Sequence, residues 1–319
     1  MRLCRFEHKN RTHIGLYDEA HVVPLAAGAR AYADATHREL SLPESDSLLD
    51  YLPPDGKARE AAATLHRWVS DNQQKLPEGA AIAAADVQLL VPVPRPNKLF
   101  LLAGNYAAHI AEGGGMATER EQTFPYVFMK PPTTTLTDPG RPVRIPEVSP
   151  GAIDWELELA VVIGRRAKGV AENKALEYVA GYTVVNDISN RKFRPNPNRT
   201  TREKDTFFDW LHGKWFDSFC PCGPCVTSAA AIADPQDLKL QLRVNGQLKQ
   251  DATTALQIFP VAAVIQFISN IVTLEPGDII STGTPAGVGN TTGTYLRPGD
   301  RIEASISSIG TLVSPVTAE

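Results

Sequence analysis

The stretch that decides the fold is Asp154-Trp155-Glu156-Leu157-Glu158-Leu159-Ala160-Val161-Val162-Ile163-Gly164. Its second half, from Leu159 to Gly164, carries no charge and predicts a buried strand. Side chains alternate between the two faces of a strand, so Asp154, Glu156 and Glu158 are expected on one face. Three carboxylates that enter a core together repel one another and are costly to desolvate. A solvent-facing acidic edge would avoid that cost, whereas a bound Mg²⁺, Mn²⁺ or Ca²⁺ would remove it.

A second strand-like run, residues 178–185, ends in Asn186-Asp187. An Asp that follows a strand is more often a turn or helix cap than a metal ligand. Beside the Glu-x-Glu strand it becomes a candidate third ligand. The sequence therefore predicts a divalent-metal site made by Glu156, Glu158 and Asp187.

Several further blocks follow one another in a recognisable order, and with them the chain resembles the fumarylacetoacetate hydrolase family. The resemblance runs from about Lys98 to the C-terminus. Its blocks are Gly104–Glu112, Phe128–Pro131, Asp154–Leu159, Gly181–Arg191, Gly213–Asp217, Val244–Gly246 with Gln250, and Pro276–Pro285. Each block alone is weak evidence, and the ordered set is specific.

The resemblance implies an α+β, β-rich fold: a mixed β-sandwich roll closed around the metal site, usually in a homodimer. Residues 1–92 are interpreted as a small N-terminal α+β domain and residues 93–319 as the catalytic domain. The boundary is placed at the proline-rich stretch 92–96, which punctuates the chain after a strand.

The elements expected from the residues alone are few. Short strands are predicted at 3–6, 13–17 and 21–25, and helices at 56–72 and 259–269. The Asn245-Gly246 pair predicts a two-residue hairpin turn.

Composition excludes several classes of protein. The chain has 319 residues and a formal charge of -4, with no clustered basic face of the kind that binds nucleic acid. It has no run of about 18 apolar residues that would span a membrane, and its first residues lack the apolar core of a signal peptide. A cytoplasmic protein without nucleic-acid or membrane partners is expected.

Three of the four cysteines cluster as Cys220-Pro221-Cys222-Gly223-Pro224-Cys225. Such a cluster invites a zinc site, but structural zinc normally takes four ligands. His212 is the one further candidate near it in sequence. We therefore expect reduced cysteines packed beside a turn.

His109 and Glu112 lie three residues apart and share one face if this segment is helical. A Glu beside a His orients the imidazole and tunes it as a general base. A single His in a loop is more often structural. The resemblance favours catalysis, because it implies a lid that carries a His–Glu dyad, and the glycines at 113–115 would form its hinge.

The resemblance also assigns residues to the substrate. Lys214 is expected to be catalytic through stabilisation of an enolate. The expected substrate-binding residues are Lys130, Arg191, Gln250 and Thr284. Fixed cations beside a divalent metal favour a small anionic oxo acid.

The predicted reaction is metal-dependent hydrolysis of a carbon–carbon bond in a 2,4-dioxo acid of the acylpyruvate, fumarylpyruvate or fumarylacetoacetate type. Oxaloacetate decarboxylation or tautomerisation, 2-oxo-enoate hydration or isomerisation, and a non-catalytic metal-binding scaffold remain alternatives. The stretch 192–212 is expected to form a loop at the pocket mouth, where its extra arginines would favour a longer or more acidic substrate.

Overall fold

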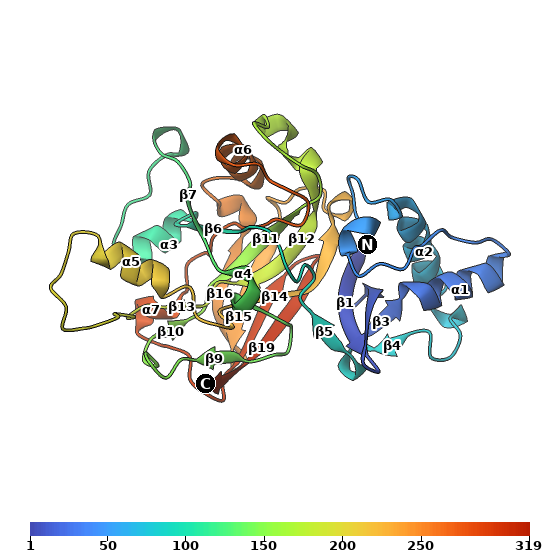
Figure 1. Cartoon of the computed structure of the whole chain (residues 1–319), viewed down its shortest axis with the longest axis horizontal. Coiled ribbons are helices and arrows are strands. Elements are labelled where there is room, and N and C mark those ends of the chain that lie inside the picture. Colours follow the sequence, from blue (N-terminus) through green and yellow to red (C-terminus); the bar gives the residue numbers. More distant parts are fainter.

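A twelve-stranded mixed sheet forms the centre of the computed structural model, which describes residues 1–319 except for the side chain of Lys75. Its main path is β4-β3-β2-β1-β14-β12-β11-β17-β6-β7, with β5 paired to β1 and β8 paired to β14 (Figure 1). The strands are β1 (Arg2–His8), β2 (Arg11–Tyr17), β3 (His21–Pro24), β4 (Ile82–Ala83), β5 (Gln88–Leu90), β6 (Leu99–Ala103), β7 (Tyr126–Met129), β8 (Leu136–Thr137), β11 (Leu157–Ile163), β12 (Val179–Asn186), β14 (Cys220–Ser228) and β17 (Ile279–Ser281).

A five-stranded sheet, in the order β16-β15-β18-β19-β9, packs against this centre, and a short pair, β10-β13, lies apart from both sheets. These strands are β9 (Val143–Ile145), β10 (Ile153–Asp154), β13 (Ser189–Asn190), β15 (Lys239–Val244), β16 (Gln247–Thr253), β18 (Arg301–Ile306) and β19 (Gly310–Ala318). The helices are α1 (Leu25–Thr36), α2 (Arg59–Asp71), α3 (Ala107–Glu112), α4 (Pro132–Thr135), α5 (Asp205–His212), α6 (Val261–Ile271) and α7 (Gly289–Thr292).

Strand β11 is buried on both faces, as its uncharged sequence predicts. Leu159 and Val161 belong to the largest apolar cluster, which includes side chains of the five-stranded sheet. Val162, on the opposite face, packs in a second cluster with residues of α2. The chain therefore forms the predicted α+β, β-rich sandwich around this strand.

The N-terminal strands and α1 and α2 lie at one end of the molecule, and α3 and α5 lie at the other (Figure 1). The predicted N-terminal strands and the 56–72 helix form, with ends that differ by a few residues. The N-terminal strands do not make a separate sheet, because β1 pairs antiparallel with β14 through Leu3 and Val226.

Two local expectations have different outcomes. The Asn245-Gly246 turn joins β15 to β16 with φ of 52° and 77°, as a two-residue hairpin requires. The prediction of a loop over 192–212 is wrong in its second half, since Asp205–His212 is helix α5. Arg199 pairs with Asp205 and Asp209 of that helix, so its charge is used within the segment. None of the described helices is long and apolar enough to cross a membrane.

Candidate metal centre

Three carboxylates meet where β11 begins and β12 ends. Glu158 lies on β11, Glu156 just before it, and Asp187 directly after β12. The Asp187 N–H donates to the Glu156 carbonyl at 2.8 Å, which holds the two chain segments together. One oxygen of each carboxylate lies within 4.8 Å of the others, so the predicted ligand set comes together.

Glu158 provides the test of whether these residues fit a metal. One of its oxygens, Oε2, accepts hydrogen bonds from Ser281 Oγ at 2.6 Å and from the Gly283 N–H at 2.9 Å. The other, Oε1, is buried without a hydrogen-bond partner. Burial, together with the charges of Asp187 and Glu156, raises the pKa of Glu158 well above its ordinary value. A hard divalent cation would satisfy Oε1 and relieve the repulsion, so the donor set fits Mg²⁺, Mn²⁺ or Ca²⁺.

Lys214 bridges two of these carboxylates. Its Nζ donates to Glu156 Oε2 at 2.8 Å and to Asp187 Oδ2 at 2.6 Å. Burial alone would lower the pKa of Lys214, but Asp187 and Glu156 outweigh it and raise that pKa. Burial would also raise the pKa of Glu156, but Lys214 and Arg191 hold it well below its ordinary range. Lys214 therefore stays charged between these two carboxylates.

Lys130 lies behind Asp187 and is fully buried. Its Nζ donates to Asp187 Oδ1, to the Ile188 carbonyl at 3.0 Å and to the Phe219 carbonyl at 2.6 Å. An ammonium group has three N–H donors, and all three are used here. Lys130 therefore has no free N–H for the predicted contact with substrate in this arrangement.

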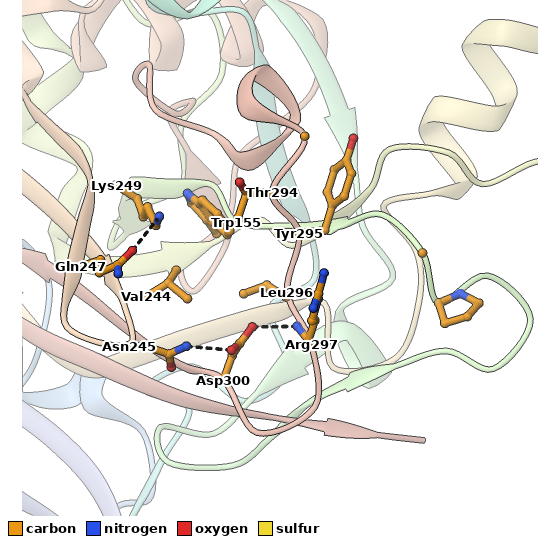
Figure 2. Close-up of a pocket in the computed structure, with 13 residues that line it drawn as sticks. Trp155, Val244, Asn245, Gln247, Lys249, Thr294, Tyr295, Leu296, Arg297 and Asp300 are labelled. Atoms are coloured by element: carbon orange, nitrogen blue, oxygen red, sulfur yellow. Dashed lines mark hydrogen bonds between the residues drawn. The ribbon is translucent and has the colours of Figure 1, made fainter.

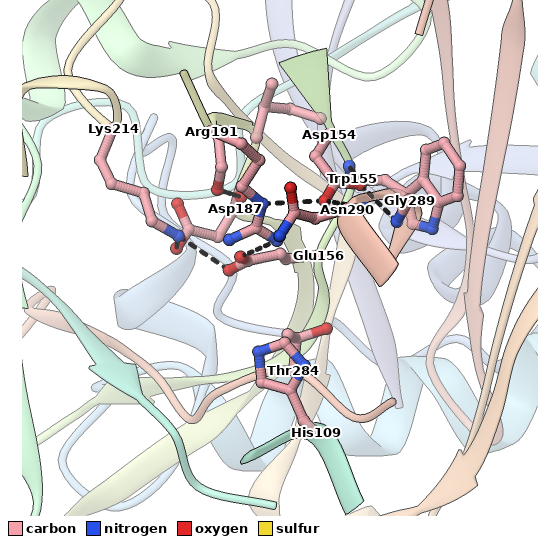
Figure 3. A network of polar contacts seen from close by, with 12 residues as sticks. His109, Asp154, Trp155, Glu156, Asp187, Arg191, Lys214, Thr284, Gly289 and Asn290 are labelled. Atoms are coloured by element: carbon pink, nitrogen blue, oxygen red, sulfur yellow. Dashed lines mark hydrogen bonds and ion pairs between the residues drawn. The ribbon is translucent and has the colours of Figure 1, made fainter. Parts of the chain in front are cut away.

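Asp154 does not join the metal ligands, in contrast to its expected place on their face. The strand is interrupted at Trp155 and Glu156: β10 ends at Asp154 and β11 begins at Leu157. The Glu156 N–H bonds to Asn186 Oδ1 rather than to a strand carbonyl. Asp154 turns away and accepts the Arg191 Nε–H at 2.8 Å (Figure 3).

Arg191 lies between Asp154 and the ligand Glu156. Its Nη2 is 2.6 Å from Glu156 Oε1 but makes no hydrogen bond of good geometry. Burial opposes the charge of Arg191, yet the two carboxylates raise its pKa. One buried N–H group of a fixed cation thus lies beside the metal ligands with capacity to bind another acceptor.

Helix α3 brings His109 and Glu112 to the site, with the imidazole drawn toward the network in Figure 3. His109 Nδ1 is 3.7 Å from Glu112 Oε2, which is longer than a hydrogen bond. This nitrogen is buried without a hydrogen-bond partner. Glu112 instead accepts the Gly287 N–H with both oxygens, at 2.9 and 3.0 Å. The two residues are adjacent, and the carboxylate fastens the helix to the segment that follows β17.

Gln250 and Thr284 bind each other and the backbone of Leu157, beside the ligand Glu156. Gln250 Nε2 donates to Thr284 Oγ1 and to the Pro285 carbonyl, both at 2.8 Å, and its Oε1 accepts the Leu157 N–H at 3.0 Å. Thr284 Oγ1 in turn donates to the Leu157 carbonyl at 3.0 Å. Both side chains hold the start of β11, and their predicted substrate contacts stay predictions.

Sequence reasoning missed the residues that hold the ligand segment and helix α3. Gly287 is the clearest of them, because its φ is +100° and a Cβ there would lie 2.1 Å from the Lys249 carbonyl oxygen. Its carbonyl accepts the Trp155 indole N–H at 3.0 Å, and its N–H binds Glu112. The glycine-rich stretch 283–289 was the available signal, but the sequence did not indicate which contacts these glycines permit.

A surface groove of about 460 Å³ is lined in part by Trp155 (Figure 2). Lys249, Arg297 and Asp300 are among the residues that line it, and none of the three candidate ligands does. The groove is therefore distinct from the metal centre.

The cysteine cluster holds no metal-ligand set among the described residues. Cys220 and Cys222 pack in one apolar cluster and Cys225 in another, and all are buried free thiols. Burial raises the pKa of Cys220 and of Cys225 to about 12. The expectation of reduced, packed cysteines agrees with this arrangement.

The fold and the buried acidic triad define a metal-binding enzyme of the mixed β-sandwich type. Residues 98–317 match the family described as fumarylacetoacetate (FAA) hydrolase C-terminal, and the chain belongs to this family.

Two relatives and one solved structure make the likeness specific. Oxaloacetate tautomerase YisK of Bacillus subtilis is 36% identical over 85% of this chain and 86% of its own. The mitochondrial oxaloacetate tautomerase fahd2 of Xenopus laevis is 37% identical over 74% of this chain and 70% of its own. Maleylpyruvate hydrolase of Sphingobium sp. SYK-6, solved with manganese(II) and pyruvate, is 28% identical, with a TM-score of 0.69 over 100% of this chain and 99% of its own.

Proposed function

We propose that this chain is a divalent-metal-dependent tautomerase that interconverts the keto and enol forms of oxaloacetate or a closely similar oxo diacid. The observation that carries the proposal is the likeness, over 70% or more of their own lengths, to two oxaloacetate tautomerases. This ranks tautomerisation above the carbon–carbon bond hydrolysis expected from the sequence.

The site supports a reaction that needs one proton carrier and no activated water. Tautomerisation moves a proton from C3 of the oxo acid to the oxygen on C2, so it consumes no co-reactant. His109 would take the C3 proton on Nε2, the ring nitrogen turned away from Glu112, and return it to the enolate oxygen. Glu112, bound to the Gly287 N–H, leaves the His109 Nδ1 without the hydrogen bond that would orient it as a base for water.

Glu156, Glu158 and Asp187 would hold the cation, which would supply positive charge to a developing enolate oxygen. Mg²⁺ or Mn²⁺ is the proposed ion. Lys214 adds a second fixed charge, and Arg191 would bind a substrate carboxylate through Nη2. These charges favour a small dianionic substrate.

Hydrolysis of an acylpyruvate is the second candidate, favoured by the full-length likeness to the maleylpyruvate hydrolase. One experiment separates the two. Enol oxaloacetate is mixed with the protein and Mg²⁺, and the keto form is followed with a dehydrogenase that accepts only that form. Release of carbon dioxide is measured in parallel, and acylpyruvates are offered separately.

Rapid keto formation without carbon dioxide, lost in Glu158→Gln and reduced about 100-fold or more in His109→Ala, is the expected result. Cleavage of acylpyruvates without acceleration of tautomerisation would reject the proposal in favour of the hydrolase. Metal binding with neither reaction would favour the scaffold alternative.

We also propose that the chain forms a homodimer through the free edge of its large sheet. Strand β7 ends the sheet, and Phe124, Tyr126 and Phe207 beside it are 58%, 64% and 55% exposed. Clustered exposed aromatic residues at a sheet edge mark an association surface. Light scattering should give a dimer mass, and Tyr126→Asp should give a monomer. A monomeric wild type would reject this assignment.

A further inference from the structure

Asp154 is a fully buried carboxylate that accepts four hydrogen bonds. Its Oδ1 accepts the N–H groups of Trp155 at 2.8 Å and Gly289 at 2.7 Å. Its Oδ2 accepts Arg191 Nε–H at 2.8 Å and the Asn290 N–H at 3.0 Å. Asp154 could coordinate a metal only by giving up these partners. We therefore look for its role in the groups that it binds.

The four donors come from three parts of the site wall, as Figure 3 shows. Trp155 belongs to the segment that carries the ligand Glu156, and Gly289 and Asn290 begin α7. The packing is tight, because a Cβ on Gly289 would lie 2.8 Å from Asp154 Oδ1 and 2.0 Å from the Thr294 carbonyl oxygen. Asp154 therefore fixes the guanidinium of Arg191 relative to the ligand segment and α7.

The guanidinium of Arg191 lies within reach of two carboxylates, those of Asp154 and Glu156. With Nε held by Asp154, its contact with Glu156 is a single close approach by Nη2 that forms no proper hydrogen bond. Without Asp154, the planar guanidinium could turn and bind Glu156 through two parallel hydrogen bonds, the geometry that Arg–carboxylate pairs prefer. That rearrangement would commit these N–H groups to Glu156, leave none of them for a substrate carboxylate, and withdraw negative charge from a metal ligand.

We propose that Asp154 is a positioning residue that keeps Arg191 Nη2 directed at a carboxylate of the substrate. The inference rests on the proposed function for the anionic oxo-acid substrate, but not on which reaction follows binding. Asp154 touches neither the substrate nor the cation and acts through Arg191.

The test is the isosteric variant Asp154→Asn, compared with Arg191→Met and with the double variant. Calorimetry measures Mn²⁺ binding to each protein, and then oxalate binding to each Mn²⁺-loaded protein. Oxalate is a small dianion that resembles the enolate of an oxo acid. Asp154→Asn should leave the Mn²⁺ Kd within about 3-fold and weaken oxalate binding about 10-fold, the cost of one charge-assisted hydrogen bond. The double variant should be no worse than Arg191→Met, because the two residues act as one unit.

Two results would overturn the proposal: unchanged oxalate affinity in Asp154→Asn, or additive losses in the double variant. Loss of Mn²⁺ binding in Asp154→Asn would also overturn it, since Asp154 would then support the ligands directly. Should Asp154→Asn fail to fold, Arg191→Lys tests the contact from the other side, because it keeps the charge but lacks the Nε–H. Retained oxalate affinity in Arg191→Lys would contradict the proposal. Failure of the wild type to bind oxalate would instead reject the proposed function.

Discussion

Both carboxylate oxygens of Glu112 accept the same backbone N–H, that of Gly287, at 2.9 and 3.0 Å. Glu112 is on α3, and Gly287 also accepts the indole N–H of Trp155, the residue before Glu156. Helix α3 is therefore bound to a residue that is itself bound to the segment carrying Glu156. One glycine thus binds α3 through its N–H and the segment of Glu156 through its carbonyl.

Glu112→Ala should loosen helix α3 without removing a metal ligand. The Gly287 N–H loses a charged acceptor, and such hydrogen bonds contribute about 1.5–3 kcal/mol. We expect faster hydrogen exchange over residues 104–116 and a fall in kcat of about 10-fold, with Mn²⁺ affinity unchanged. Glu119→Ala, at an exposed residue of the same connection, is the matched control. Equal exchange in wild type and Glu112→Ala would show that the contact does not stabilise this helix.

Glu158→Gln should abolish tight metal binding. It removes the negative charge of the ligand whose Oε1 is buried and unpartnered, so the Mn²⁺ Kd should rise at least about 100-fold. Metal at 100 times the wild-type Kd should stabilise the wild type by about 2.7 kcal/mol and the variant by no more than about 0.4 kcal/mol. Thermal melts with and without Mn²⁺ measure this. Glu177→Gln, at an exposed surface ion pair, should behave as wild type. A metal-dependent shift in Glu158→Gln as large as that of the wild type would remove Glu158 from the ligand set.

The raised pKa of Glu158 makes metal affinity depend on pH. In the metal-free protein, the folded chain keeps this proton above the ordinary pKa of 4.5, whereas the unfolded chain releases it. The contribution of Glu158 to the free energy of unfolding therefore falls as the pH rises from 4.5 to the raised pKa. Metal binds the carboxylate form, so affinity should rise with pH over the same range. Calorimetry in two buffers of different ionisation enthalpy should show proton release on binding. Binding without proton release at the lower end of that range would contradict a raised pKa.

Lys130→Met should cost stability more than it costs substrate binding. The substitution removes the buried donor of Asp187 Oδ1 and of the Ile188 and Phe219 carbonyls, and breaking a buried ion pair costs about 3–5 kcal/mol. Urea unfolding should show this loss. The KM of the protein that remains folded should change less than 3-fold, because Lys130 has no free N–H to offer a substrate. Lys174→Met, at a pair whose side chains are about 60% exposed, should leave the urea midpoint close to that of the wild type. A large rise in KM with little loss of stability would restore the substrate contact expected from the sequence.

The sequence predicted the three carboxylates of the metal centre because the prediction depended on residue chemistry and not on tertiary contacts. Carboxylates beside an uncharged strand are costly, and that cost indicates a cation wherever the strand lies in the fold. The role of Asp154 could not be predicted in this way. Its direction depends on a break between β10 and β11 that Asn186 makes by accepting the Glu156 N–H, a contact between residues 30 positions apart.

The same limit applies to Lys130 and Gln250. Residue type and family position suggest a polar group near substrate, but only the folded chain shows whether its donors are already used. For Lys130 three internal acceptors use them, and for Gln250 two do. The helix at Asp205–His212 was missed for a different reason: its preceding segment, rich in Pro, Asn and Arg, suggested an irregular chain throughout.

The pairing of β1 with β14 has a consequence for any attempt to divide the chain. The family match begins at residue 98, yet Leu3 and Val226 are partners in one ladder, and β5 extends the same group of strands. Cutting the chain before residue 98 would leave β14 with unpaired backbone groups and would uncover Val162 and Ala180, which pack against the N-terminal helices. Such a fragment would expose an unpaired strand edge beside an apolar surface. We therefore expect it to aggregate rather than to form a smaller active enzyme.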